Sequence, residues 1–201
     1  IDRVFTVSGF GAVVTGTLSG GSLRVGDDLQ LYPEDRVLRV RGLQTHQESV
    51  SAAQPGSRVA VNLAGISAHE MTRGQVLAPP RLMTPSQRID ARLHLLASSP
   101  VALKQNAAVD LFTGATEVSA RVTLLDRDLL EPGQTGWVQL RLAAPIAVLK
   151  RDRFIVRRAS PSETLGGGEV IDPHPTRHRR LHAETLTSLE TLASGSPREL
   201  V

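Results

Sequence analysis

The sequence predicts a mainly β protein with a small closed barrel, a second β-rich segment and a short helical segment at its C-terminal end. Three observations support this fold class. Hydrophobic residues form 40% of the 201 residues and aromatic residues 3%, so the cores must be built from aliphatic side chains. Short stretches alternate apolar and polar residues between glycine and proline turns, as strands do. After Pro175 this alternation gives way to apolar residues at helical spacing.

The N-terminal part of the chain predicts a series of short strands. They fall within residues 2–7, 11–18, 20–33, 36–44, 57–66 and 72–80. Within residues 36–44, Val37, Val40 and Leu43 are expected to alternate with Arg36, Arg39 and Arg41, and Arg39 and Arg41 share one face. Closing such a set of strands removes their exposed edges, so this part favours a small closed barrel.

A proline-containing joint over residues 78–88 separates this part from a second β-rich segment. The expected strands of this segment lie near residues 88–96, 107–113, 117–125, 135–142, 153–158 and 168–172. Three consecutive glycines, Gly166 to Gly168, predict a bulge or a close approach of two backbones. We expect the domains to cover residues 1–82, 83–175 and 176–201.

The C-terminal tail predicts helix. Apolar residues at helical spacing form one stripe: Leu186, Leu189, Leu192 and Ala193. Residues 196–199, with the sequence SPRE, then resemble a capping box that opens another helix. A helix start so near the last residue indicates an internal fragment of a longer protein.

Three histidines, His174, His178 and His182, lie four residues apart at the possible helix start. Such spacing is compatible with a metal site, but the neighbouring prolines disrupt the first turn and the neighbouring arginines repel a cation. We therefore favour a solvated basic linker and expect no metal.

The sequence contains no clustered catalytic set. It has no phosphate-binding loop of the GxxxxGK[ST] type, no HExxH motif and no cysteine, which excludes disulfides and cysteine chemistry. No apolar run is long enough to span a bilayer. The absence of cysteine fits a reducing cytoplasm, and we expect a binding module, not an enzyme.

Basic residues form separate clusters, and the formal net charge is +3. With so few aromatic residues, these clusters suit contacts with backbone phosphates better than base stacking. For the strand that carries Arg39 and Arg41, a solvated face is an equally good interpretation. The RNA-contact candidates are Arg39, Arg41, Lys150, Arg151, Arg157, Arg158, Arg177, Arg179 and Arg180.

Several long motifs resemble a known family. Residues 9–33 (GFGAVVTGTLSGGSLRVGDDLQLYP), together with VRGLQTHQESVSAAQPGSRVAVNLAGI and TRGQVLAPP, are similar to the second domain of translational GTPases of the elongation factor Tu type. The segment DRFIVRRASPSETLGGGEVIDPHPTRHRR resembles the end of the third domain of bacterial selenocysteine-specific elongation factors. The resemblance covers roughly residues 1–180 and implies two consecutive β-barrels that help to hold an aminoacyl-tRNA.

The resemblance also implies an aminoacyl pocket. In this family an acidic–basic pair at the first strand and a later basic residue line that pocket, and Asp2, Arg3 and Arg58 match these positions. Two guanidiniums favour an ionised selenol over the neutral hydroxyl of a seryl group. Without the resemblance, Asp2 and Arg3 would be interpreted as an ordinary surface ion pair worth about 0–1 kcal/mol.

A neighbouring surface is expected to hold the acceptor end of the tRNA. The candidates are Gly56, Asn62, Gly65 and Arg73. Arg73 could equally tie the last strand of the barrel to a carboxylate, and both interpretations remain open.

The resemblance implies partners and cofactors as well. The expected partners are selenocysteinyl-tRNA, the ribosome, and GTPase and winged-helix domains of the same longer protein, with an mRNA hairpin reached only through the latter. No cofactor is expected in this chain, because GTP and Mg²⁺ belong to the GTPase domain. The alternative function is a tRNA- or ribosome-contacting barrel module of another translational GTPase.

Overall fold

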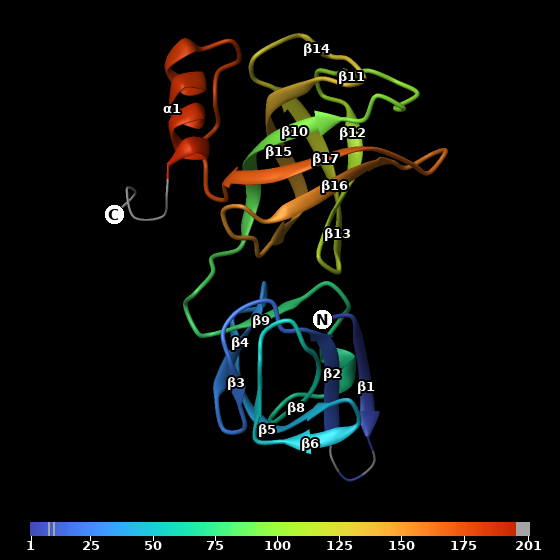
Figure 1. The fold of residues 1–201 in the computed structure, drawn as a ribbon, viewed down its shortest axis with the longest axis vertical. Coiled ribbons are helices and arrows are strands. Elements are labelled where there is room, and N and C mark those ends of the chain that lie inside the picture. The colour runs from blue at the N-terminus through green and yellow to red at the C-terminus, as the bar shows by residue number, and fades with distance from the viewer. Residues whose placement is uncertain (8, 10, 196–201) are drawn as a thin grey trace. The chain divides into compact units, whose positions relative to one another are not determined.

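The computed structural model describes residues 1–7, 9 and 11–195. The chain divides into a first unit, residues 1–84, and a second unit that begins at Pro85. Strands dominate both units, and the second also carries the helix α1 (Ala183–Ser194) (Figure 1). The expected mainly β fold with a helix near the C-terminal end is therefore confirmed. The helix start expected at residues 196–199 lies outside the described residues.

The first unit is a curled sheet. Its hydrogen-bonded strands run in the order β1-β2-β8-β5-β4-β9, with β6 paired to β5 and a separate ladder of β3 and β7. The backbone of Ile1 joins the two ends of this order: its amino group donates to Gln75 at 2.7 Å, and its carbonyl accepts from Gly74 at 3.0 Å. The strand bounds are β1 (Arg3–Val7), β2 (Gly11–Thr17), β3 (Leu23–Arg24), β4 (Asp28–Tyr32), β5 (Arg36–Thr45), β6 (Glu48–Val50), β7 (Ala52–Ala53), β8 (Arg58–Leu63) and β9 (Val76–Ala78).

The inward face of β5 differs from the expected one. Val37 is 54% exposed, whereas Leu38 and Val40 are buried. A β-bulge between Val40 and Gly42 then resets the alternation, so that Leu43 also faces the core. A regular pattern through Val37, Val40 and Leu43 was therefore wrong at Val37, because these three residues do not share one phase of a period-two strand.

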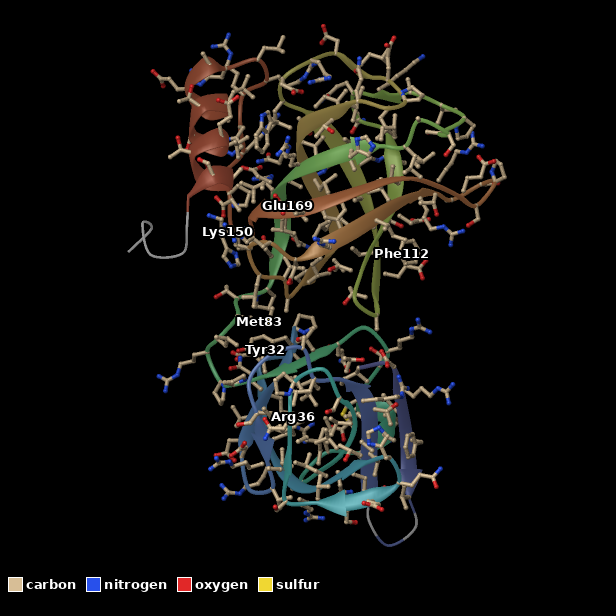
Figure 2. The ribbon with its side chains drawn as sticks, viewed as in Figure 1. Tyr32, Arg36, Met83, Phe112, Lys150 and Glu169 are labelled. Atoms are coloured by element: carbon tan, nitrogen blue, oxygen red, sulfur yellow. The ribbon has the colours of Figure 1, made fainter. Side chains whose placement is uncertain are left out.

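A charged network holds the loop between β8 and β9. The backbone amide and the hydroxyl of Ser67 donate to the Glu70 carboxylate, and Arg36, which is labelled in Figure 2, donates to the same carboxylate at 2.6 Å. Arg36 also donates to the carbonyl of Gly65. The bonds from Ser67, and after them the one from Arg36, lower the pKa of Glu70 to about 2.

We predict a visible acid dependence from Glu70. Because its pKa is lowered from the ordinary value of 4.5 to about 2, its stabilising effect is present above pH 4.5 and is lost as the pH falls through 2. In Glu70→Gln, denaturant midpoints measured between pH 2 and pH 5 should therefore change less with pH than in the native chain. Glu48→Gln, on exposed β6, serves as the control, and identical slopes in all three proteins would contradict the prediction.

The second unit contains a closed barrel with the strand order β10-β15-β13-β12-β16-β17, accompanied by a small ladder of β11 and β14. Its core is almost entirely Leu, Ile, Val and Ala, with Phe154 as the buried aromatic residue of the cluster. The strand bounds are β10 (Ser86–Leu95), β11 (Leu103–Lys104), β12 (Ala108–Thr113), β13 (Thr116–Leu124), β14 (Leu129–Leu130), β15 (Thr135–Ile146), β16 (Arg153–Arg158) and β17 (Glu163–Asp172).

The three glycines of β17 bring two backbones close together, as the sequence predicted. Gly166, Gly167 and Gly168 pair with Leu95, His94 and Leu93 of β10. A Cβ atom added at Gly166 or Gly168 would lie well under 3.0 Å from a carbonyl oxygen of β10, closer than real Cβ atoms come. Only glycine fits these two positions without moving a strand.

The histidines do not share a helix. Helix α1 begins at Ala183, and Leu181 before it adopts a left-handed φ of 54°. His178 instead contacts the barrel: its Nε2 atom lies 2.5 Å from Oδ2 of Asp90, which is almost fully buried. Gln139 donates to the other oxygen of Asp90 at 2.8 Å. Burial raises the pKa of Asp90, and the hydrogen bonds from Gln139 and His178 oppose that shift.

Candidate nucleic-acid interface

The outer face of β1, β2 and β8 carries the predicted pocket residues. Arg3 lies opposite Thr15, and Arg58 lies opposite Thr17 in the neighbouring pair of strands. Because side chains opposite one another share a face, Arg3 and Arg58 project from the same side of the sheet, one on either side of β2.

The guanidinium of Arg58 reaches across β2. It donates to Oδ2 of Asp2 at 2.7 Å and lies 3.4 Å from the hydroxyl of Thr15. The side chain of Arg58 remains 58% exposed and that of Asp2 35% exposed. A pair this exposed contributes little to stability, about 0–1 kcal/mol, and its cation stays accessible to a ligand.

Phe5 belongs to the same outer face and was missed as a site residue. It is two positions after Arg3 on β1, lies opposite Val13 and is 40% exposed. Val13 in turn lies opposite Asn62, whose side-chain amide donates to the carbonyl of Ala12 at 3.3 Å. The sequence could have indicated this position of Phe5, because residues two apart in a strand point to the same face, as Arg3 and Phe5 do. The face therefore combines cations, an aromatic ring and an amide.

The remaining acceptor-end candidates are spread out. Gly56 lies in the turn before β8 and Gly65 follows its end, so a strand of six residues, about 20 Å long, separates them. Both glycines have left-handed φ angles, 83° and 75°, which explains the choice of glycine there. Arg73 is exposed and forms no ion pair with any residue that the structure describes.

Several of the basic candidates have partners within the chain. Arg39 lies 3.3 Å from Asp28, and Arg158 donates to Glu163 at 2.5 Å. Arg180 donates to the carbonyls of Leu124 and Arg127, both at 2.9 Å, which gives it a structural role.

The other basic candidates differ in exposure. The Arg157 guanidinium lies 5.8 Å from the centre of the Phe112 ring. Nζ of Lys150 is buried without a hydrogen-bond partner among the described residues. Arg41, Arg151, Arg177 and Arg179 are exposed, and Arg151 donates to the carbonyl of Gly195 at 3.2 Å.

A row of three arginines on the second barrel was missed by the sequence analysis. Arg141 of β15 lies directly opposite Arg88 of β10 on one side and Arg121 of β13 on the other. All three line a groove of about 700 Å³. We call these three residues the arginine row. None of them forms an ion pair with a carboxylate in the described part of the chain.

The arginine row is electrostatically unfavourable by itself. Like charges placed directly opposite each other across a sheet destabilise the pairing. One carboxylate lines the groove, that of Asp110, and it accepts a hydrogen bond from Ser119 at 2.9 Å. An anion in the groove would relieve the repulsion, because planar guanidiniums bind phosphate oxygens well.

Two further classes of site are absent from the described part of the chain. No group of three or more His, Cys, Asp or Glu side chains there could hold a metal ion. No helix there has the length and apolar character that crossing a membrane requires.

The sequence matches two family models. The model described as "Selenocysteine-specific elongation factor, beta-barrel domain" matches residues 88–177, and "Elongation factor Tu domain 2" matches residues 11–78.

Curated relatives and a solved structure give the same picture. A selenocysteine-specific elongation factor of Desulfomicrobium baculatum is 41% identical over 201 residues, which are 100% of this chain and 32% of the relative. One of Escherichia coli (strain K12) is 33% identical over 96% of this chain and 30% of its own length. The crystal structure of bacterial selenocysteine-specific elongation factor EF-Sec superposes with a TM-score of 0.80 at 26% identity, over 96% of this chain and 30% of that chain. The chain thus spans about a third of the length of these relatives.

Proposed function

Because this chain is homologous along its whole length to selenocysteine-specific elongation factors and corresponds to their barrel domains, we propose that it is an aminoacyl-tRNA-binding module that serves selenocysteine delivery to the ribosome at recoded UGA codons. The first unit holds the aminoacylated end of the tRNA, and the second unit binds backbone phosphates. GTP and Mg²⁺ are bound by other parts of the longer family members, and the module works in the cytoplasm with the ribosome as a partner.

The observation that carries this proposal is the pair of arginines beside Thr15. Arg3 and Arg58 project from one outer face, and Arg58 contacts the carboxylate of Asp2. A selenol is ionised near neutral pH, whereas the hydroxyl of a seryl group is not. Two permanently charged guanidiniums therefore favour the selenolate, and Asp2 orients one of them in the absence of ligand.

The surface around the arginines suits the rest of an acceptor end. The exposed ring of Phe5 offers a flat apolar surface next to Arg3, and aromatic rings stack on nucleobases. Asn62 supplies an amide on the same face, across β2 from Phe5. Gly56, Gly65 and Arg73 stay as proposed neighbours of this surface, on the evidence of the resemblance alone.

In the second unit, the arginine row is the best candidate for phosphate contacts. Consecutive phosphates along an RNA backbone would neutralise adjacent guanidiniums and so offset their mutual repulsion. Arg157 and Arg158 end β16 and directly precede Ala159, which lines the same groove. The basic candidates Arg39, Arg41, Lys150, Arg151, Arg177 and Arg179 lie outside this groove and are secondary.

We predict opposite effects of neutralising the arginine row on RNA binding and on stability. The double variant Arg121→Gln/Arg141→Gln should bind aminoacyl-tRNA about tenfold or more weakly, with the log–log salt slope reduced by about one per lost phosphate contact. The same variant should unfold at an equal or higher temperature, because opposing like charges are removed. Filter binding at several salt concentrations and thermal unfolding measure the two effects.

The matched control is Arg153→Gln, which removes an exposed arginine from β16 outside the groove. It should leave the salt slope almost unchanged. If the loss of affinity per removed charge is the same in Arg153→Gln as in Arg121→Gln/Arg141→Gln, the groove is not the phosphate site.

The alternative is a barrel module from another translational GTPase. The match of residues 11–78 to elongation factor Tu domain 2 is compatible with it. The match of residues 88–177 to a barrel domain of selenocysteine-specific factors favours the first proposal.

A further inference from the structure

The segment between the second barrel and α1, residues 173–182, is held tightly by polar contacts; we call it the strap. The buried side chain of Gln139 donates both to Asp90 at 2.8 Å and to the strap carbonyl of Thr176 at 2.9 Å. His178 lies 2.5 Å from the second oxygen of Asp90. These contacts fix the middle of the strap to the barrel wall between β10 and β15.

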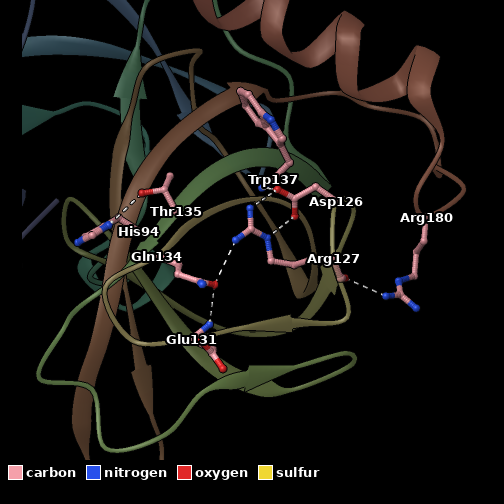
Figure 3. Close-up of polar contacts among 8 residues, drawn as sticks. All are labelled: His94, Asp126, Arg127, Glu131, Gln134, Thr135, Trp137 and Arg180. Carbon is pink, nitrogen blue, oxygen red and sulfur yellow. Dashed lines mark hydrogen bonds and ion pairs between the residues drawn. The ribbon is translucent and has the colours of Figure 1, made fainter.

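The end of the strap is fixed as firmly. The amide of Leu181 donates to the carbonyl of Leu125 at 2.7 Å. Arg180 donates to the carbonyls of Leu124 and Arg127. Arg127 is itself held, because it makes two bonds to Asp126, at 2.8 and 3.0 Å (Figure 3). The strap therefore ends against a rigid, hydrogen-bonded part of the barrel.

Helix α1 is attached mainly by apolar contacts. Leu189 is its buried residue, packed with Leu125 and Ile171, and the partly buried residues beside it are Trp137, Leu186, Leu192 and Ala193. At its C-terminal end, the carbonyl of Gly195 accepts one hydrogen bond from Arg151. Figure 1 shows α1 lying along the outside of the barrel.

Open space lies on both sides of this contact. A cavity of about 260 Å³ lies on one side and is lined by polar groups that include Asp172, His182 and Glu184. A second cavity, of about 520 Å³, lies on the other side beside Trp137 and Glu190. The apolar contact of α1 thus lies between two cavities with polar lining.

We propose that α1 undocks from the second barrel as a unit while the strap, held by Asp90, Gln139 and His178, stays in place as the pivot. Segments with few buried apolar contacts open locally before the rest of a domain does. Here the boundary between the fixed strap and the opening helix falls at Leu181, which has a left-handed backbone conformation. The proposal does not depend on the function proposed above.

Amide hydrogen exchange on the whole 201-residue chain tests this proposal. The amides of α1 should exchange at least a hundredfold faster than that of Leu181, which in turn should be protected like the barrel strands. Leu189→Ala should speed exchange in α1 at least tenfold and leave the Leu181 amide and the melting temperature of the barrel unchanged. The control Thr187→Ala truncates an exposed residue of the same helix and should not speed exchange in α1.

A second pair of variants tests the pivot. His178→Ala should speed exchange at Leu181 as well as in α1, whereas His178→Gln, which keeps an N–H donor for Asp90, should restore most of the protection. The proposal is overturned if native α1 exchanges as slowly as β10 and β15, or if Leu189→Ala speeds exchange at Leu181 as much as in the helix. It is also overturned if His178→Ala leaves Leu181 protected.

Discussion

Replacing Gly168 by alanine is expected to unfold the second barrel at temperatures at which the native chain is stable. A Cβ atom at this position would clash with the backbone carbonyl oxygen of Arg92, and a backbone oxygen cannot rotate away as a side chain can. Overpacking of a core usually costs about 1–3 kcal/mol, and a clash with a backbone that is paired on both sides belongs at or above the upper end. Since domains are stable by about 5–15 kcal/mol, a loss of this size is severe.

Thermal unfolding followed by the fluorescence of the single Trp137 reports on this barrel. We expect the midpoint of Gly168→Ala to fall by on the order of 10–20 °C. The control is Gly20→Ala, because a Cβ atom there meets nothing within 4 Å and the residue has no left-handed φ. A Gly168→Ala midpoint within about 2 °C of the native one would show that β10 and β17 are not this close.

The second large effect is expected at Arg58. Hydrogen bonds to a charged group contribute about 1.5–3 kcal/mol each. Arg58→Ala removes one of the two guanidiniums that would contact the selenolate. It should therefore reduce the preference for selenocysteinyl-tRNA over seryl-tRNA by about ten- to a hundredfold, because 1.4 kcal/mol corresponds to tenfold. Stability should change little, since Arg58 and Asp2 form an exposed pair.

Asp2 provides an independent check of the same idea. Asp2→Asn keeps a hydrogen-bond acceptor for Arg58 but removes the charge that competes with the ligand. If the carboxylate serves to orient the guanidinium, this variant should retain selectivity to a much greater extent than Arg58→Ala.

The sequence predicted local features better than long-range ones. Period-two alternation and turn residues are local, so the strands and the helix of the tail could be identified. The β5 bulge between Val40 and Gly42 was not predictable, because a bulge depends on the pairing with β8. The bulge brings Leu43 to the same face as Val40, whereas Val37 faces solvent because it has the opposite phase to Val40 in a regular strand.

The same limit applied to the candidate site. Asp2, Arg3 and Arg58 came from the family motif, whereas their arrangement around Thr15 required the register of three strands. The arginine row lies on three different strands and has no sequence signature, since Arg88, Arg121 and Arg141 are neighbours only through pairing. His178 was assigned to a solvated linker because nothing local indicates its buried partner Asp90.

The central claim is that the outer face of β1, β2 and β8 recognises an ionised selenocysteinyl group. It is tested most directly by comparing the affinities of Arg58→Ala and the native sequence for selenocysteinyl- and seryl-tRNA of the same body, in a full-length family member that carries this region. Arg24→Ala, an exposed arginine of β3, is the charge control. We predict that Arg58→Ala weakens binding of the selenocysteinyl form about ten- to a hundredfold more than the seryl form, whereas the control affects both equally. Equal weakening of both forms by Arg58→Ala would contradict the claim and make Arg58 a phosphate or structural contact.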